Sequence, residues 1–106
     1  MQLLPENLAR DLSRSAAHPH DLDARAGVEW VQTHLSHVFL TRTRVYKLRK
    51  PVDLGFVDFS TRARRNADCR REIALNRRLA ADVYLGIAPI ERARAGYRVG
   101  AVATES

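Results

Sequence analysis

Cysteine is scarce in this chain, since Cys69 is the only one among 106 residues. A single thiol excludes an internal disulfide and any metal site built from several thiolates of one chain, and we expect a reducing, cytoplasmic compartment. Long hydrophobic runs are also missing, because no stretch approaches the roughly 18 consecutive apolar residues that span a bilayer. Charged residues occupy the start of the chain, where a signal peptide needs an apolar core. The sequence therefore predicts a soluble protein with no membrane partner.

Lysine is the other scarce residue type. Lys47 and Lys50 are the only lysines, and arginine supplies the rest of a basic excess that gives a formal net charge of +6. Such an excess is typical of proteins that bind nucleic acid, and arginines cluster at 62–65, 70–71 and 77–78. They are spread around a predicted helix, however, and no aromatic stacking platform accompanies them. The pattern favours a solvated helix face over a nucleic-acid interface.

The length leaves room for one domain, which we expect to comprise residues 1–106. Within it, residues 1–20 are expected to form an N-terminal helix and linker, and residues 28–106 a sheet with a long helix. Apolar residues at every fourth position predict the short N-terminal helix within 3–17. Residues 61–80 contain no glycine or proline and are rich in good helix formers, which predicts the long helix.

Five short runs of β-branched or aromatic residues predict strands, at 28–34, 37–41, 44–50, 83–90 and 97–102. Polar segments at 41–44 and 91–96 predict the turns between them. The expected fold class is α+β, with one small antiparallel sheet of about five strands, one long helix and a short N-terminal helix.

The histidines raise the question of a metal site. They stand at four positions, His18, His20, His34 and His37. Their spacings match no strong ligand motif, and histidines in loops or at strand ends are far commoner than metal ligands. We therefore expect no metal in this chain.

Glu72 stands out on the predicted long helix. A step of roughly 100° per residue places it within an apolar stripe that also contains Cys69 and Leu75, away from the arginine-rich back. A carboxylate directed at a core is costly unless a cation or hydrogen-bond donors meet it there. Glu72 is therefore expected to have a basic partner on the sheet against which the helix packs.

The third predicted strand offers that partner. Side chains alternate between its two faces, so Lys47 shares one face with Val45 and Arg49, whereas the rival Lys50 falls on the opposite face. A Val-x-Lys strand followed by a helix with an inward Glu resembles the Lys–Glu ion pair that positions nucleotide phosphates in protein kinases. The same pattern also fits a purely structural ion pair between sheet and helix.

A longer set of segments resembles one bacterial family. In chain order they are THLSHVFL at 33–40, VYKLRKPVDLGF at 45–56, DFST at 58–61, EIALNRRL at 72–79 and YLGIAPI at 84–90. The family has an aminoglycoside-phosphotransferase-like kinase domain, often followed by a P-loop ATP-binding domain. The resemblance runs from about His18 to near the end of the chain. It implies the N-terminal lobe of a kinase-like fold, a small antiparallel sheet with one helix that closes over ATP.

The resemblance also implies site residues. Lys47 matches the lysine that contacts the phosphates and Glu72 its helix partner, with Lys50 as a rival for Lys47. Val45 would lie against the adenine.

The segment 33–37 occupies the place of the loop that covers the phosphates, which brings His34 and Ser36 to the nucleotide. This loop lacks the glycines of the protein-kinase loop, so phosphate contacts would come from its backbone N–H groups and from Ser36.

The departures from the family pattern limit the activity that the chain is expected to have. It contains neither a catalytic loop of the His-x-Asp type nor a metal-binding Asp after the last strand, so no catalytic residue is assigned. Mg²⁺ and catalysis would come from a missing lobe, and a separate C-terminal lobe or P-loop domain is the expected partner. The expected function is a truncated ATP-binding lobe. The alternative is a small basic α+β module that binds nucleic acid or a protein.

Overall fold

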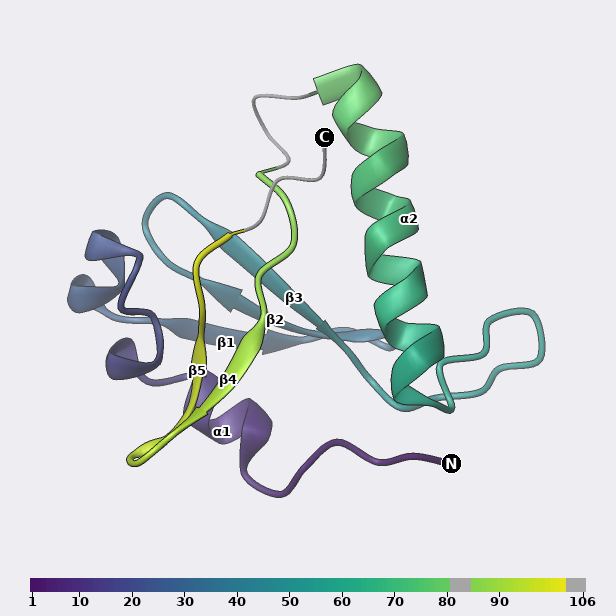
Figure 1. The fold of residues 1–106 in the computed structure, drawn as a ribbon, viewed down its shortest axis with the longest axis horizontal. Helices are drawn as coiled ribbons and strands as arrows, with labels where there is room; N and C mark the ends of the chain where they lie inside the picture. The colour runs from purple at the N-terminus through teal and green to yellow at the C-terminus, as the bar shows by residue number, and fades with distance from the viewer. Residues whose placement is uncertain (81–84, 103–106) are drawn as a thin grey trace.

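A computed structural model describes residues 1–80 and 85–102 (Figure 1). The helical parts are α1 (Leu8–Leu12), two short 3-10 helices (Ser15–Ala17 and Leu22–Ala26) and the long helix α2 (Arg62–Ala80). The strands are β1 (Glu29–Gln32), β2 (Ser36–Leu40), β3 (Val45–Arg49), β4 (Ile90–Ala93) and β5 (Gly96–Val99). Helices and antiparallel sheets thus occur together, which confirms the α+β class.

The first three strands form an antiparallel sheet in the order β1-β2-β3. A short polar link joins β2 and β3 as a hairpin, as the sequence predicts. In the register of this hairpin, Ser36 lies opposite Arg49 and Val38 lies opposite Lys47. Directly opposed residues of an antiparallel pair point to the same face of the sheet. All four of these side chains therefore share one face.

The last two strands differ from the prediction of one sheet. Within the described residues, β4 and β5 form a separate two-stranded sheet. β4 begins at Ile90 and includes 91–93, which the sequence pattern assigns to a turn. Pro89 has no backbone N–H and cannot extend a ladder, so the strand starts after it and the turn moves to 94–95. Part of the predicted strand, residues 83–84, lies outside the described residues.

The hydrophobic core lies on the face of the three-stranded sheet opposite Lys47. Phe39 of β2 is only 1% exposed and packs with Leu8 and Leu12 of α1 and with Val99 of β5. Figure 1 shows α1 and the β4–β5 hairpin on the same side of this sheet. They cover its apolar face and leave the Lys47 face to α2.

A buried carboxylate joins α1 to the β4–β5 hairpin. Asp11 accepts a hydrogen bond from the Tyr97 N–H at 3.1 Å. The adjacent Gly96 has a φ of 127°, and a Cβ at this position would lie 2.6 Å from Asp11 Oδ2, so only glycine fits there. α1 is shorter than the helix predicted within 3–17, because Asn7 before it has a left-handed φ of 67° and Arg14 after it is extended.

A second buried carboxylate ties the N-terminal segment to the sheet. Asp21 accepts hydrogen bonds from Thr41 Oγ1 at 2.8 Å and from the Tyr46 hydroxyl at 2.9 Å. Burial raises the pKa of Asp21, but these hydrogen bonds outweigh burial and hold the pKa below its ordinary value. The segment before β1 is therefore anchored by polar contacts as well as by the core.

His37 and the single tryptophan form a pH-dependent contact. Trp30 Nε1 donates to His37 Nδ1 at 3.1 Å, and burial together with the charge of Lys50 lowers the pKa of His37. Below about pH 6.5 the unfolded chain takes up a proton that the folded chain does not, so the free energy of unfolding falls until the folded pKa is reached. Protonated Nδ1 also cannot accept the Trp30 bond. We expect stability to fall from about pH 6.5 downward, and the Trp30 fluorescence of the folded chain to change at lower pH, where folded His37 takes up its proton.

Two variants test this expectation about His37. The fluorescence transition should vanish in His37→Gln and persist in His34→Gln, which removes an exposed histidine from the nearby turn. A transition that survives in His37→Gln would show that another group titrates.

The first half of α2 contacts the three-stranded sheet. The buried guanidinium of Arg65 donates to the Phe59 carbonyl at 2.8 Å and holds the start of the helix. Leu75, which the sequence places on the inner stripe, is 55% exposed instead. The reason is visible in Figure 1, where the second half of α2 runs past the three-stranded sheet. Among the described residues, no helix combines the length and apolar character needed to cross a membrane.

Candidate functional site

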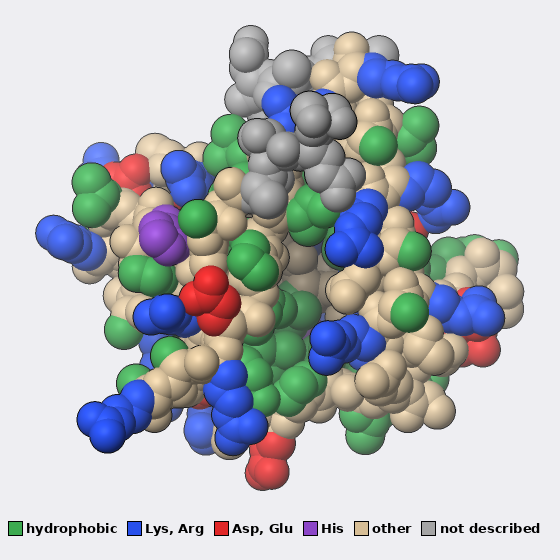
Figure 2. Space-filling model, in the orientation of Figure 1, with side chains coloured by type: hydrophobic (Ala, Val, Ile, Leu, Met, Phe, Trp, Pro, Cys, Tyr) green, Lys and Arg blue, Asp and Glu red, His purple; other side chains and the backbone are tan. Residues whose placement is uncertain are grey.

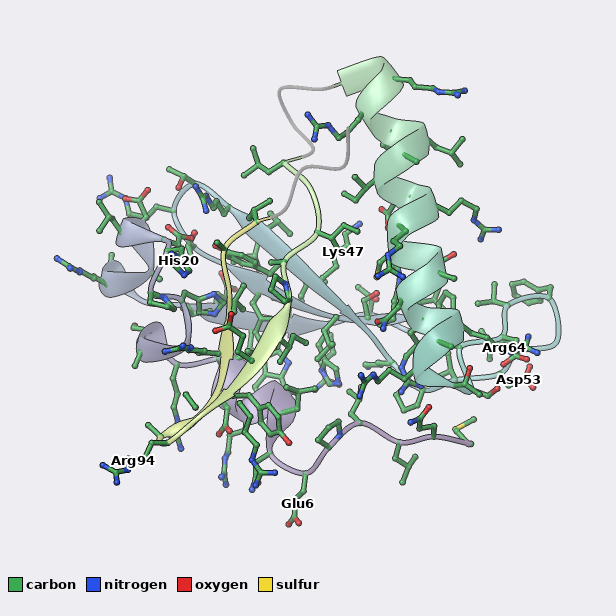
Figure 3. The ribbon with its side chains drawn as sticks, in the orientation of Figure 1. Glu6, His20, Lys47, Asp53, Arg64 and Arg94 are labelled. Carbon is green, nitrogen blue, oxygen red and sulfur yellow. The ribbon has the colours of Figure 1, made fainter. Side chains whose placement is uncertain are left out.

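The contact expected between the sheet and the long helix is present. Lys47 Nζ of β3 lies 3.5 Å from Glu72 Oε1 of α2, and Figure 3 shows Lys47 between the two elements. The Lys47 side chain is 48% exposed, whereas that of Glu72 is more buried. The ammonium group has three donors and uses one of them in a long contact. It therefore keeps donors that can turn toward a ligand.

Arg49 is the central cation of the site, a role that the sequence reasoning missed. Its Nε donates to Asp68 Oδ2 at 3.1 Å, its Nη1 donates to Ser36 Oγ at 2.7 Å, and its Nη2 contacts Glu72 Oε2. The side chain is only 12% exposed. The available signal was strand alternation, which places Arg49 on the same face as Lys47.

Both carboxylates around Arg49 are paired with cations. Lys47 and Arg49 face Asp68 and Glu72, and Arg71 adds a contact to Asp68 Oδ1 at 2.7 Å. Such pairing is what allows carboxylates to lie against a sheet without a large desolvation cost.

Cys69, next to Asp68, is half-buried, and burial raises the pKa of its thiol. This environment favours the thiol over the reactive thiolate.

A pocket opens beside the charged cluster. Its volume is about 310 Å³ and it lies between the turn at 33–36 and the sheet face that carries Lys47. The lining residues are Thr33, His34, Leu35, Ser36, Val38, Lys47 and Arg49. The structure thus brings three of the predicted site residues to one concave surface, namely Lys47, Ser36 and His34.

The other predicted site residues, Glu72, Val45 and Lys50, do not line this pocket. Glu72 contacts the lining residue Lys47. Val45 lies two residues before Lys47 on the same face and is 58% exposed. Lys50 follows the end of β3 and lowers the pKa of His37, whose side chain points to the opposite face. The contacts with Glu72 therefore come from Lys47 and Arg49, and Lys50 lies apart from them.

The turn that lines the pocket is built differently from the sequence expectation. The Thr33 hydroxyl accepts the N–H groups of Leu35 and Ser36 at 3.3 and 3.0 Å, so two of the expected phosphate donors are engaged within the turn. Ser36 is buried, and its oxygen accepts from Arg49. Its own hydroxyl hydrogen remains a donor. The Ser36 hydroxyl and the exposed His34 are polar groups of this turn that can still meet a ligand.

Several arginines of the predicted clusters have partners within the chain. Arg64 pairs with Asp58 at 3.0 Å, near the exposed loop that Figure 3 marks with Asp53. Arg65 is buried rather than solvated. Figure 2 shows further basic side chains along the visible side of α2, separated by uncharged surface. On the face shown, the basic surface is therefore interrupted and does not resemble a continuous track for a nucleic-acid backbone.

His18 and His20 lie near each other in the N-terminal segment, whereas His34 and His37 belong to the turn before β2 and to β2 itself. His18 is buried, its Nε2 donates to the Leu12 carbonyl at 2.7 Å, and its ring packs on Tyr46. Figure 3 shows His20 near the N-terminal turns, away from Lys47. Within residues 1–80 and 85–102, no group of three or more His, Cys, Asp or Glu side chains is placed to hold a metal ion.

Neither a family model nor a solved structure matches the chain. Proteins of Mycobacterium tuberculosis and Mycobacterium bovis, described only as uncharacterised, are similar to it and share 44% identity over 66 residues. The similar segment makes up 62% of this chain but 13% of each relative. The chain is thus similar to a small part of much longer mycobacterial proteins.

Proposed function

We propose that this chain is the nucleotide-binding lobe of an aminoglycoside-phosphotransferase-like kinase and that its ligand is ATP. The observation that carries the proposal is the contact of Lys47 with Glu72 at the edge of the pocket beneath the turn at 33–36. In kinases a strand lysine held by a helix glutamate contacts nucleotide phosphates. The proposal gives Lys47 and Glu72 these two roles.

The chemistry of the pocket suits a nucleotide. Lys47 supplies a positive charge with donors to spare, and the Ser36 hydroxyl can donate beside it. The sheet face next to Lys47 is apolar, because Val38 lies opposite Lys47 and Leu40 lies opposite Val45. A flat base can rest on such a surface while its phosphates reach the ammonium group.

The division of labour follows from the residues that the chain has. Asp68 and Glu72 are held by Arg49, so the carboxylates of this site are already paired with cations. We therefore assign Mg²⁺ and the acceptor's proton to a second lobe, and this chain to binding and orienting the nucleotide. Similarity to a small segment of much longer proteins is consistent with a lobe that works beside others.

Mg-ATP titration of the ¹⁵N-labelled chain, followed by ¹H–¹⁵N NMR, tests the proposal. We expect the largest shifts at residues 33–36 and Lys47, which line the pocket, at Glu72, which contacts Lys47, and at Val45, which shares the sheet face of Lys47 and would lie against the base. Mg²⁺ alone should leave them unchanged, and inorganic triphosphate should shift the turn and Lys47 but not Val45. A well-dispersed spectrum whose peaks do not shift with Mg-ATP at millimolar concentration would reject the proposal and favour the binding-module alternative.

A further inference from the structure

Arg49 joins three separate segments through one guanidinium group. It lies at the end of β3, contacts Asp68 and Glu72 on α2, and donates to Ser36 at the start of β2. All three nitrogens have a partner, and the guanidinium also lies 5.7 Å from the centre of the Phe59 ring. A planar group with fixed donor directions is held in one orientation by this many contacts.

Arg49 and Lys47 hold the helix to different degrees. Lys47 makes one contact to Glu72 at 3.5 Å and is half exposed, and pairs of this kind contribute little to docking. Arg49 is largely buried and contacts two carboxylates one helical turn apart. The Glu72 carboxylate divides its oxygens between the two cations, with Oε1 toward Lys47 and Oε2 toward Arg49. Losing Lys47 would therefore leave Glu72 held by Arg49.

We propose that Arg49 is the positioning residue of this site: it clamps α2 to β3 and couples the turn at 33–36 to the helix, so that Glu72 stays in place to orient Lys47 toward a phosphate. The clamp of α2 to β3 follows from contacts in the ligand-free structure. The coupling of the turn to the helix rests on the proposed function. Because Nη1 of Arg49 donates to the Ser36 oxygen, the Ser36 hydroxyl hydrogen is directed away from Arg49. A phosphate that accepts a hydrogen bond from the Ser36 hydroxyl therefore acts on Arg49 and, through Arg49, on Asp68 and Glu72.

Amide hydrogen exchange without nucleotide tests the clamp. Arg49→Lys keeps the charge but loses the several fixed donors of the planar guanidinium. The amides of residues 66–74 should therefore exchange about tenfold faster, while the exchange rate of the Phe39 amide in the core changes little. Lys47→Gln is the matched control and should alter the same helix amides less than about twofold. Equal acceleration in the two variants, or none in Arg49→Lys, would overturn the clamp. Should Arg49→Lys fail to fold, Ser36→Ala serves instead, because it removes only the contact with Arg49 Nη1. It should accelerate amide exchange less than Arg49→Lys would, and again only in the helix.

Mg-ATP titration of the same variants tests the coupling. Asp68 reports the coupling because it contacts Arg49, whereas Glu72 also contacts Lys47 directly. In the unmodified chain the Asp68 amide should shift with those of the turn, and in Arg49→Lys the turn should still shift while the Asp68 amide should not. An Asp68 shift that persists in Arg49→Lys would overturn the coupling. If no amide of the unmodified chain shifts, the proposed function and the coupling fail together, whereas the clamp is still decided by hydrogen exchange.

Discussion

Lys47→Ala is expected to weaken Mg-ATP binding by roughly 10- to 100-fold, because a charge-assisted hydrogen bond of about 1.5–3 kcal/mol to the phosphates is lost. The side chain is half exposed at the edge of the pocket, and its removal leaves Glu72 paired with Arg49. The fold should therefore persist. Isothermal titration calorimetry of the variant and the unmodified chain measures the change in affinity.

Lys50→Ala is the matched control for that substitution. It removes the other lysine and the same single charge, so both variants carry an equal loss of long-range attraction for ATP. Lys50 does not line the pocket, and its variant should bind Mg-ATP within about twofold of the unmodified chain. If both variants lost affinity equally, the net charge would explain binding, and Lys47 would have no specific phosphate contact. If only Lys50→Ala lost affinity, the roles of the two lysines would be reversed.

Phe39→Ala is expected to lower the free energy of unfolding by about 3–5 kcal/mol, since it deletes a fully buried ring and leaves a cavity. Phe39 is the largest fully buried side chain among the described residues and lies where α1, β2 and β5 meet. A small domain is typically stable by only about 5–15 kcal/mol, so the loss takes a large part of the total. Urea unfolding followed by Trp30 fluorescence and circular dichroism measures it.

Phe56→Ala supplies the control for the core substitution. Phe56 is 86% exposed on the loop before α2, so the free energy of unfolding of Phe56→Ala should stay within about 0.5 kcal/mol of that of the unmodified chain. A comparable loss of stability in both variants would mean that the Phe56 loop is packed in solution. No loss in Phe39→Ala would contradict the core described above.

The elements that the sequence predicted well are those set by local patterns. The strand at 44–50 was predicted from a short run with β-branched and aromatic residues after a short polar link, and it forms the β2–β3 hairpin with β3 at Val45–Arg49. The absence of glycine and proline over 61–80 predicted α2 almost to its ends. Strand alternation separated Lys47 from its rival Lys50, the family resemblance favoured Lys47 as the partner of Glu72, and the structure brings Lys47 into contact with Glu72.

Other features could not be predicted because they depend on which elements meet. Helical periodicity assigned Leu75 to a packed stripe, but α2 runs past the sheet before it reaches that residue. The β4–β5 hairpin packs on the apolar face of the first sheet instead of extending its edge, which no local pattern reveals. The Thr33 side chain uses the backbone donors that the sequence assigned to phosphate.

Arg49 illustrates the difference between what the sequence determines and what the tertiary structure adds. The sequence by itself determined the hairpin, the long helix and the face of β3 that carries Lys47 and Arg49, because strand and helix periodicity are properties of neighbouring residues. Only the tertiary structure decided that Arg49, rather than Lys47, holds two carboxylates of α2 and the hydroxyl of Ser36. The physical reason is that these partners lie 13 to 23 residues from Arg49 along the chain and meet it only when the helix docks on the sheet.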